Sequence, residues 1–246
     1  MQYFLSLIFL LNIPGSNKLP GVETDVFQTD LGDLSMHFIG HGTLMFELDG
    51  YVIHIDPVSR EADYSNLPDA DLILVTHHHG DHLDGSAIEQ IMKENTRIIM
   101  TETCEKNLEL HHGPGIKVMK NGDRMEVDRI QVEAIPAYNI VNKRNNGEPF
   151  HPEGIGNGYI LSFGDFKVLV AGDTENIPEI KALKDIDVAF LPMNLPYTMS
   201  PEMVADAARA FKPAVLYPYH FGSTDTKRLI QLMKDVKEVE IRIRDF

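Results

Sequence analysis

The chain has 246 residues, with 22 Lys and Arg against 37 Asp and Glu, so its formal net charge is −15. A hydrophobic share of 43% is enough for a packed core, and it excludes disorder of the whole chain. The acidity argues against a nucleic-acid binder, because phosphate contacts need clustered Lys and Arg and no basic run is present.

Residues 3–11 form an apolar run that is too short to span a bilayer as a helix, which needs about 20 residues. The run has the length of a signal-peptide core, although no Lys or Arg precedes it and no clear cleavage site follows. Two interpretations stay open. A signal-peptide remnant predicts a periplasmic or secreted protein, whereas a segment packed on the domain predicts a cytoplasmic one. Residues 14–21 are typical of a linker, so we expect one domain over residues 22–246.

The pattern becomes regular from residue 33. Apolar runs predict strands over 36–39, 44–48, 51–55 and 71–75, the last buried on both faces because it is continuously apolar. Asp49-Gly50 predicts a type I′ hairpin turn, which needs positive φ at both positions. A helix over 86–93 and a strand over 97–100 follow.

Further strands are predicted near 116–119, 124–127 and 129–136, before a long loop over 137–157. A hairpin pairs 159–163 with 167–171 through Gly164-Asp165. The last third alternates strands and helices, predicted at 187–191, 201–211, 214–218, 224–235 and 238–243. Hairpins followed by β/α units, in each of two halves, predict an α/β architecture with mixed sheets packed together and helices outside.

Cys104 is the single cysteine, which excludes an intramolecular disulfide and a thiolate metal cluster. We expect it to be a packing residue on a short helix. Any transition-metal site must therefore use carboxylates and some of the 11 His.

Residues 76–82 read Thr-His-His-His-Gly-Asp-His and follow the strand over 71–75 directly. So many imidazoles need water or partners, since burying them without either costs several kcal/mol. Alternate residues of an extended loop point the same way, so His77 and His79 can bind one metal while Asp81 and His82 reach a second. His78 points away. The alternative to a metal site is a solvated His-rich loop without a function, but such a loop would be unusual between a core strand and a helix.

The spacing His-x-His-x-Asp-His after a strand resembles the signature of the metallo-β-lactamase superfamily of hydrolases, and the resemblance runs from about residue 33 to 243. It implies a four-layer αββα sandwich with two mixed β-sheets. It also implies two divalent metal ions at the sheet edge, expected to be Zn²⁺, with Mn²⁺ or Fe²⁺ as alternatives because His and Asp suit all three.

Other motifs of the family match this chain residue by residue. Asp56 in Ile-Asp-Pro corresponds to the carboxylate that orients metal-binding groups; a turn Asp before Pro is the alternative. Asp173 in Gly-Asp-Thr corresponds to the carboxylate shared by both metals. His220 corresponds to the strand-ending His of the second site, although such a His is more often a core residue.

The remaining ligand departs from the family pattern Pro-Ala-x-His, because Asn139 stands where the His is expected. An amide oxygen is a poor substitute for imidazole on zinc. In the family pattern this His is followed by Gly-Tyr and then by a strand. If residues 138–150 are an insertion, His151 fits that order, so we favour His151 over Asn139. His111 and His112 precede the expected strand and are weaker candidates.

The segments Pro196–Pro201, Tyr219–Gly222 and Gly40–Gly42 resemble a branch that contains L-ascorbate-6-phosphate lactonase. In that branch His41 lies in the opening turn, where it either faces the substrate or has no role. Loops 57–70, 138–158 and 193–200 would shape the substrate pocket, and Arg144 either meets an anionic group or is solvated. The sequence predicts neither the substrate nor the oligomeric state.

The resemblance implies a hydrolase in which a hydroxide held by both metals attacks an ester, lactone, amide or phosphodiester of a small molecule. His77, His79 and His151 would hold one metal, and the catalytic Asp81 could take the proton of the water. Alternatives are a nuclease of the superfamily, a drug-hydrolysing β-lactamase and a metal-binding protein without activity. A flavodiiron protein is disfavoured, because it carries a carboxylate where His79 stands.

Overall fold

Two seven-stranded β-sheets form the centre of the molecule, which a computed structural model describes for residues 19, 21–110 and 115–244. In the first sheet the spatial order follows the chain: β1 Glu23–Thr29, β2 Gly32–Gly40, β3 Thr43–Leu48, β4 Tyr51–Ile55, β5 Ala70–Leu74, β6 Met92–Met100 and β7 Ile116–Val118. The strands from β1 to β4 pair antiparallel, and those from β4 to β7 pair parallel.

The second sheet repeats this plan, again in chain order: β8 Arg124–Val127, β9 Ile130–Ala137, β10 Gly156–Phe163, β11 Phe166–Val170, β12 Val188–Pro192, β13 Val215–Tyr219 and β14 Glu240–Ile241. It is antiparallel from β8 to β11 and parallel from β11 to β14. Both sheets are therefore mixed, as predicted.

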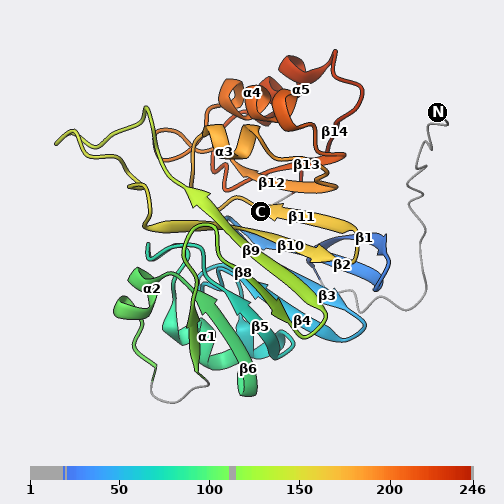
Figure 1. Cartoon of the computed structure of the whole chain (residues 1–246), viewed down its shortest axis with the longest axis vertical. Coiled ribbons are helices and arrows are strands. Elements are labelled where there is room, and N and C mark those ends of the chain that lie inside the picture. Colours follow the sequence, from blue (N-terminus) through green and yellow to red (C-terminus); the bar gives the residue numbers. More distant parts are fainter. Residues whose placement is uncertain (1–18, 20, 111–114, 245–246) are drawn as a thin grey trace.

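Helices cover the outer face of each sheet, so the molecule has four layers (Figure 1). The helices α1 Gly85–Ile91 and α2 Glu102–Asn107 pack on the first sheet, with the short 3₁₀ helix Tyr64–Asn66 nearby. The second sheet carries α3 Pro178–Lys181, α4 Pro201–Phe211 and α5 Thr226–Met233. The predicted αββα sandwich is confirmed.

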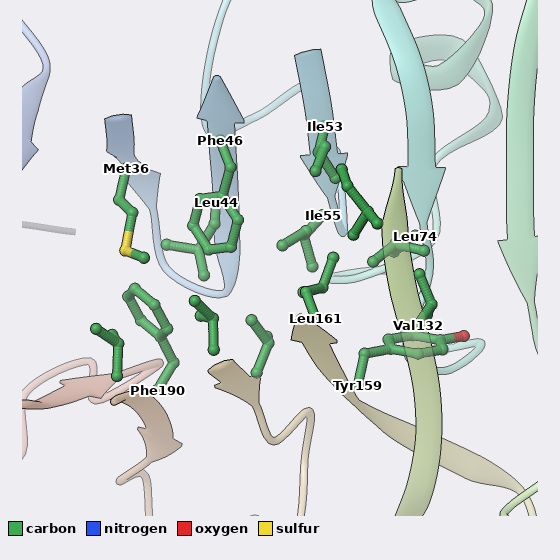
Figure 2. Packing of buried hydrophobic residues seen from close by; sticks show 14 of the residues in the cluster. Met36, Leu44, Phe46, Ile53, Ile55, Leu74, Val132, Tyr159, Leu161 and Phe190 are labelled. Atoms are coloured by element: carbon green, nitrogen blue, oxygen red, sulfur yellow. The ribbon is translucent and has the colours of Figure 1, made fainter. Parts of the chain in front are cut away.

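The alternation of side chains along each strand explains the layers, because neighbours on a strand face opposite sides of the sheet. On β5, Leu72 and Leu74 join the core between the sheets, whereas Ile73 packs beneath α1. The strand predicted to be buried on both faces is therefore confirmed. Figure 2 shows the central core, to which both sheets contribute large side chains: Met36, Leu44, Phe46, Ile53, Ile55, Leu74, Val132, Tyr159, Leu161 and Phe190.

Most predicted elements are present, but the short helices Tyr64–Asn66 and Pro178–Lys181 were not predicted. The strand β1 was not predicted because Val26 and Phe27 are its only apolar residues; it forms through its register with β2. The last strand, predicted over 238–243, is confined to Glu240–Ile241. The turn at Asp49-Gly50 has the predicted positive φ values of 49° and 79°.

Two other predictions concern single features of the chain. Cys104 is buried on α2, as expected, and burial raises the pKa of its thiol to about 11. The apolar run over 3–11 lies outside the described residues. Within the part of the chain that is described, no helix is long and apolar enough to cross a membrane.

A buried histidine on β4 should make stability depend on pH. Burial lowers the pKa of His54 from 6.5 to about 4, so below pH 6.5 the unfolded chain binds a proton that the folded chain excludes. Stability should fall as the pH falls through that window. From pH 7 to 5 we expect a loss of about 2 kcal/mol from His54 alone.

The variant His54→Gln tests this, because its amide keeps a donor for the carbonyl of Pro68, which lies 2.9 Å from His54 Nε2. Urea unfolding at pH 5 and 7, with chelator present, should show a smaller pH-dependent loss in the variant than in the wild type. Equal losses would contradict the assignment.

Candidate metal centre

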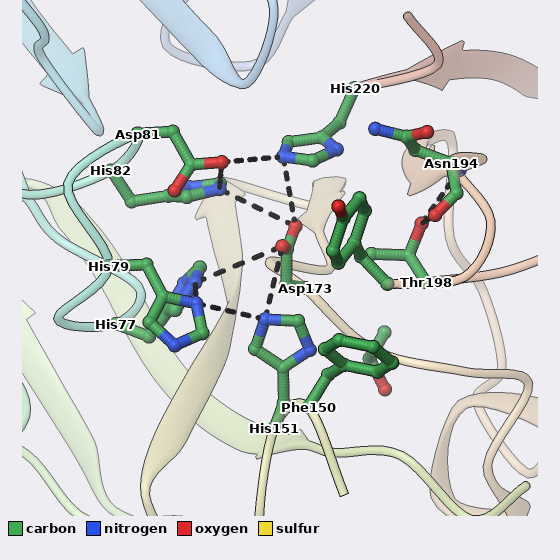
Figure 3. A network of polar contacts seen from close by, with 12 residues as sticks. His77, His79, Asp81, His82, Phe150, His151, Asp173, Asn194, Thr198 and His220 are labelled. Carbon is green, nitrogen blue, oxygen red and sulfur yellow. Dashed lines mark hydrogen bonds and ion pairs between the residues drawn. The ribbon is translucent and has the colours of Figure 1, made fainter. Parts of the chain in front are cut away.

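Loops at one edge of both sheets bring seven His and Asp side chains together (Figure 3). The loop that leaves β5 contributes four of them, and its turn is closed by the amides of His82 and Leu83, which donate to the carbonyl of His79. The second sheet contributes three, from the segment before β10, from just after β11 and from the end of β13. The full set is His77, His79, Asp81, His82, His151, Asp173 and His220.

Three histidines form one half of the cluster. His79 Nδ1 lies 3.1 Å from His77 Nε2 and 3.2 Å from His151 Nε2. Potential ligand atoms of these three residues all lie within 4.8 Å of one another, close enough to hold one metal ion.

Asp173 lies between this half and the other one. Its Oδ2 is 3.2 Å from His151 Nε2 and 3.8 Å from His77 Nε2. Its Oδ1 is 3.5 Å from His82 Nε2 and 3.6 Å from His220 Nε2. A carboxylate in this place can reach ions in both halves.

The second half contains buried polar atoms without hydrogen-bond partners. Three of them lie close together: His82 Nε2, His220 Nε2 and Asp173 Oδ1. An unpaired buried polar group costs free energy, and three of them facing one point are explained by a shared cation. Imidazole and carboxylate are suitable ligands for Zn²⁺, Mn²⁺ or Fe²⁺. The residues present therefore fit a divalent metal.

Asp56 holds the second half in place from behind. Its Oδ2 lies 2.7 Å from His82 Nδ1 and accepts a hydrogen bond from Thr76 Oγ1, while its Oδ1 accepts from the amide of Thr76. Because a carboxylate only accepts, His82 carries its proton on Nδ1 and turns Nε2 toward the cluster. Asp56 itself lies away from the point where a metal would sit, as the predicted orienting role requires.

The surroundings set the protonation of the cluster in two ways. Burial lowers the pKa of His77 well below 6.5 and that of His79 to about 4, so both favour the neutral form that binds metal. Burial also opposes charge on His82, but the nearby carboxylates of Asp173 and Asp56 outweigh it and raise the pKa to about 9. The carboxylates of the second half therefore favour the binding of a cation there.

The structure places His151, and not Asn139, in the cluster. Asn139 Oδ1 accepts from the amide of His151 and lies 2.8 Å from His151 Nδ1. Asn139 Nδ2 donates to the carbonyl of Tyr197, which fixes the orientation of the amide. Asn139 therefore lies behind His151 and directs its Nε2 toward Asp173. The weaker candidates, His111 and His112, lie outside the described residues.

Glu175 is a buried site residue that the sequence analysis missed. Its carboxylate accepts hydrogen bonds of 2.7 Å from the amides of Ile140, Val141 and Asn142, and one of 3.2 Å from Asn139 Nδ2. It thereby fixes the segment that carries His151. Its position two residues after Asp173 is the one signal in the sequence.

His41 faces the cluster rather than the solvent alone. Its Nε2 lies 3.6 Å from Asp81 Oδ2, and its ring centroid is 3.8 Å from that of His220. Asp81 Oδ2 is in turn 3.4 Å from His220 Nε2. His41 has a φ of 49°, a conformation that costs energy in a non-glycine residue and is often found at functional sites. His78, by contrast, belongs to none of the potential ligand groups of the described residues.

An open cleft of about 520 Å³ lies over the cluster. Its walls include Asn194 and Tyr197 from the segment after β12, and Arg144 and Phe150 from the segment before β10. The cleft gives a small molecule access to the side of the cluster that faces solvent.

Comparison with known proteins agrees with this fold. Residues 35–220 match the model of the Beta-lactamase superfamily domain. The chain therefore belongs to the metallo-β-lactamase superfamily. It is 30% identical over 226 residues to a UPF0173 metal-dependent hydrolase of Thermococcus onnurineus, covering 85% of this chain and 96% of that one, and so belongs to that family.

Two further similarities support the assignment. A UPF0173 metal-dependent hydrolase of Methanopyrus kandleri is 29% identical over 193 residues, which cover 76% of this chain and 83% of that one. A crystal structure of a Parabacteroides distasonis protein is 47% identical, with a TM-score of 0.84 over 92% of this chain and 99% of that one. The lactonase-like branch stays a prediction.

Proposed function

We propose that the protein is a hydrolase that uses two divalent metal ions to cleave an ester, lactone, amide or phosphodiester bond of a small molecule. The observation that carries this proposal is the set of unpaired, buried ligand atoms below an open cleft. Membership of a family whose relatives are named metal-dependent hydrolases supports it.

The ligands divide between the two halves of the cluster. One ion would be held by His77, His79 and His151. The other would be held by Asp81, His82 and His220, and Asp173 would be shared by both ions. We expect Zn²⁺, with Mn²⁺ or Fe²⁺ as alternatives. A bound divalent metal supplies a Lewis acid and a water whose pKa is lowered to about 7.

The residues of the chain supply position and proton handling. Asp56 and Asn139 fix the ring nitrogens of His82 and His151, so that each presents Nε2 to the cluster. The side chain of Asp81 is 31% exposed and therefore open to the cleft. Burial alone would raise the pKa of Asp81, but His220 and His41 hold it below its usual range. Asp81 therefore stays a carboxylate that can accept a hydrogen bond from a nucleophilic water.

Metal analysis combined with turnover tests this function. Protein purified without chelator should contain about two equivalents of Zn, Mn or Fe, measured by plasma mass spectrometry. It should hydrolyse at least one member of a panel of lactones, esters, amides and phosphodiesters. A fully metal-loaded sample that turns over none of them would favour a metal-binding protein without activity, and a sample that takes up no metal would refute the proposal.

A further inference from the structure

The segment 138–150, here called the arm, is held in a defined conformation. Glu175 accepts hydrogen bonds from three of its amides, and Asn142 Nδ2 donates to the carbonyl of Thr198. Its tip is closed by hydrogen bonds of Arg144 and Glu148 and by a bridge between Lys143 and Pro149. The arm extends away from the body between β9 and β10 (Figure 1).

The arm brings one cation to the wall of the cleft. Of the described residues that line the cleft, Arg144 is the single Lys or Arg. Its Nη2 donates to the carbonyl of Phe150, and its Cζ lies 5.0 Å from the centroid of the Phe150 ring. None of the ion pairs between described residues involves Arg144. In a chain with a net charge of −15, a guanidinium without a carboxylate partner is notable at the edge of a cluster of potential metal ligands.

Two aromatic rings stand next to this cation. The ring centroids of Phe150 and Tyr197 are 5.1 Å apart, with an angle of 77° between the planes, so the two rings form a corner. Tyr197 is 47% exposed and lines the cleft, so its ring is accessible to a bound molecule. Figure 3 shows Phe150 beside His151, at the mouth of the cluster.

The chemistry of these groups defines a ligand. A guanidinium is always charged and binds a carboxylate or phosphate through two parallel N–H donors. The contact with the Phe150 ring and the hydrogen bond to the Phe150 carbonyl position the Arg144 guanidinium, and the hydrogen bond uses only one of its N–H donors. Aromatic corners bind flat rings through offset and edge-to-face contacts.

We propose that Arg144, Phe150 and Tyr197 form a subsite that binds a planar ring carrying a carboxylate or phosphate group, while the bond to be cleaved lies over the metal cluster. This proposal rests on the proposed hydrolase function and names the class of its substrate. The subsite would also draw an anion into the cleft of a protein that repels anions elsewhere.

The variant Arg144→Ala tests the subsite, and Lys143→Ala is its matched control, because the neighbouring lysine is exposed and does not line the cleft. The metal-loaded proteins are compared on 4-acetoxybenzoate, which is anionic, and on 4-methylphenyl acetate, which is neutral. The ratio of kcat/KM for the anionic over the neutral ester should fall about 10- to 100-fold in Arg144→Ala, the range expected for a hydrogen bond between charged groups. It should be unchanged in Lys143→Ala.

Direct binding separates failure of the subsite from failure of the hydrolase function. Titration calorimetry with benzoate and with phenylphosphonate should show weaker binding to Arg144→Ala than to Lys143→Ala, and the ligand with the larger difference identifies the preferred anion. If neither ester is hydrolysed, these titrations still decide the subsite. An unchanged ester ratio, equal effects in both variants, or equal binding by both variants would overturn the proposal.

Discussion

Replacing His79 with Ala should lower kcat/KM at least about 100-fold, because the loss of a proposed metal ligand would remove several kcal/mol of transition-state stabilisation. His79 Nδ1 is the atom of this loop that lies near both His77 and His151. The fold should survive, since the turn is closed through the carbonyl of His79, which alanine keeps. Turnover of any ester that the wild type hydrolyses measures the loss of activity, metal content measures the loss of bound metal that we also expect, and circular dichroism measures whether the fold survives.

The chain offers a closely matched control in the next residue. His78→Ala removes the same group from the same loop, yet His78 lies in none of the potential ligand groups of the described residues. We expect this variant to keep its metal content and its activity within a few-fold. If His78→Ala lost as much metal as His79→Ala, the loop would act through its general conformation and the assignment of ligands would be wrong.

The sequence predicted most of the cluster because its residues lie where strands end. Asp81 and His82 follow β5, Asp173 follows β11, and His220 follows β13. Strand ends can be located from apolar runs, and parallel neighbours bring their ends to one edge. The choice of His151 over Asn139 rested on the order of motifs, and the structure brings His151 into the cluster and places Asn139 behind it.

What the sequence did not predict depends on contacts between distant segments. Glu175 looks like a solvated glutamate until the fold places three amides of the arm around its carboxylate. The orientation of His41 depends on the other sheet, because its carbonyl accepts a hydrogen bond from the amide of His220. No periodicity in either segment carries such information, since it arises only when the two sheets pack.

That packing makes Phe190 a residue whose truncation should have a large effect on stability. Phe190 is fully buried on β12, and its ring lies 5.9 Å from that of Phe46 in the first sheet and 5.0 Å from that of Tyr217 in its own sheet. Removing a buried aromatic ring costs its transfer free energy and leaves a cavity. Phe190→Ala should therefore lower the free energy of unfolding by about 3–5 kcal/mol, measured by urea denaturation.

The same variant should weaken the metal centre, because each sheet supplies part of it. The loop after β5 brings four of the proposed ligands from the first sheet, whereas His151, Asp173 and His220 come from the second. If sheet packing holds the residues from the two sheets at their distance, loosening it should lower metal affinity as well as stability. Ile230→Ala is the control: this side chain is 48% exposed on α5, so its loss should change stability by less than about 0.5 kcal/mol and leave metal affinity unchanged. A Phe190→Ala protein that is destabilised but binds metal as tightly as the wild type would show instead that the loops set the ligand geometry without help from the core.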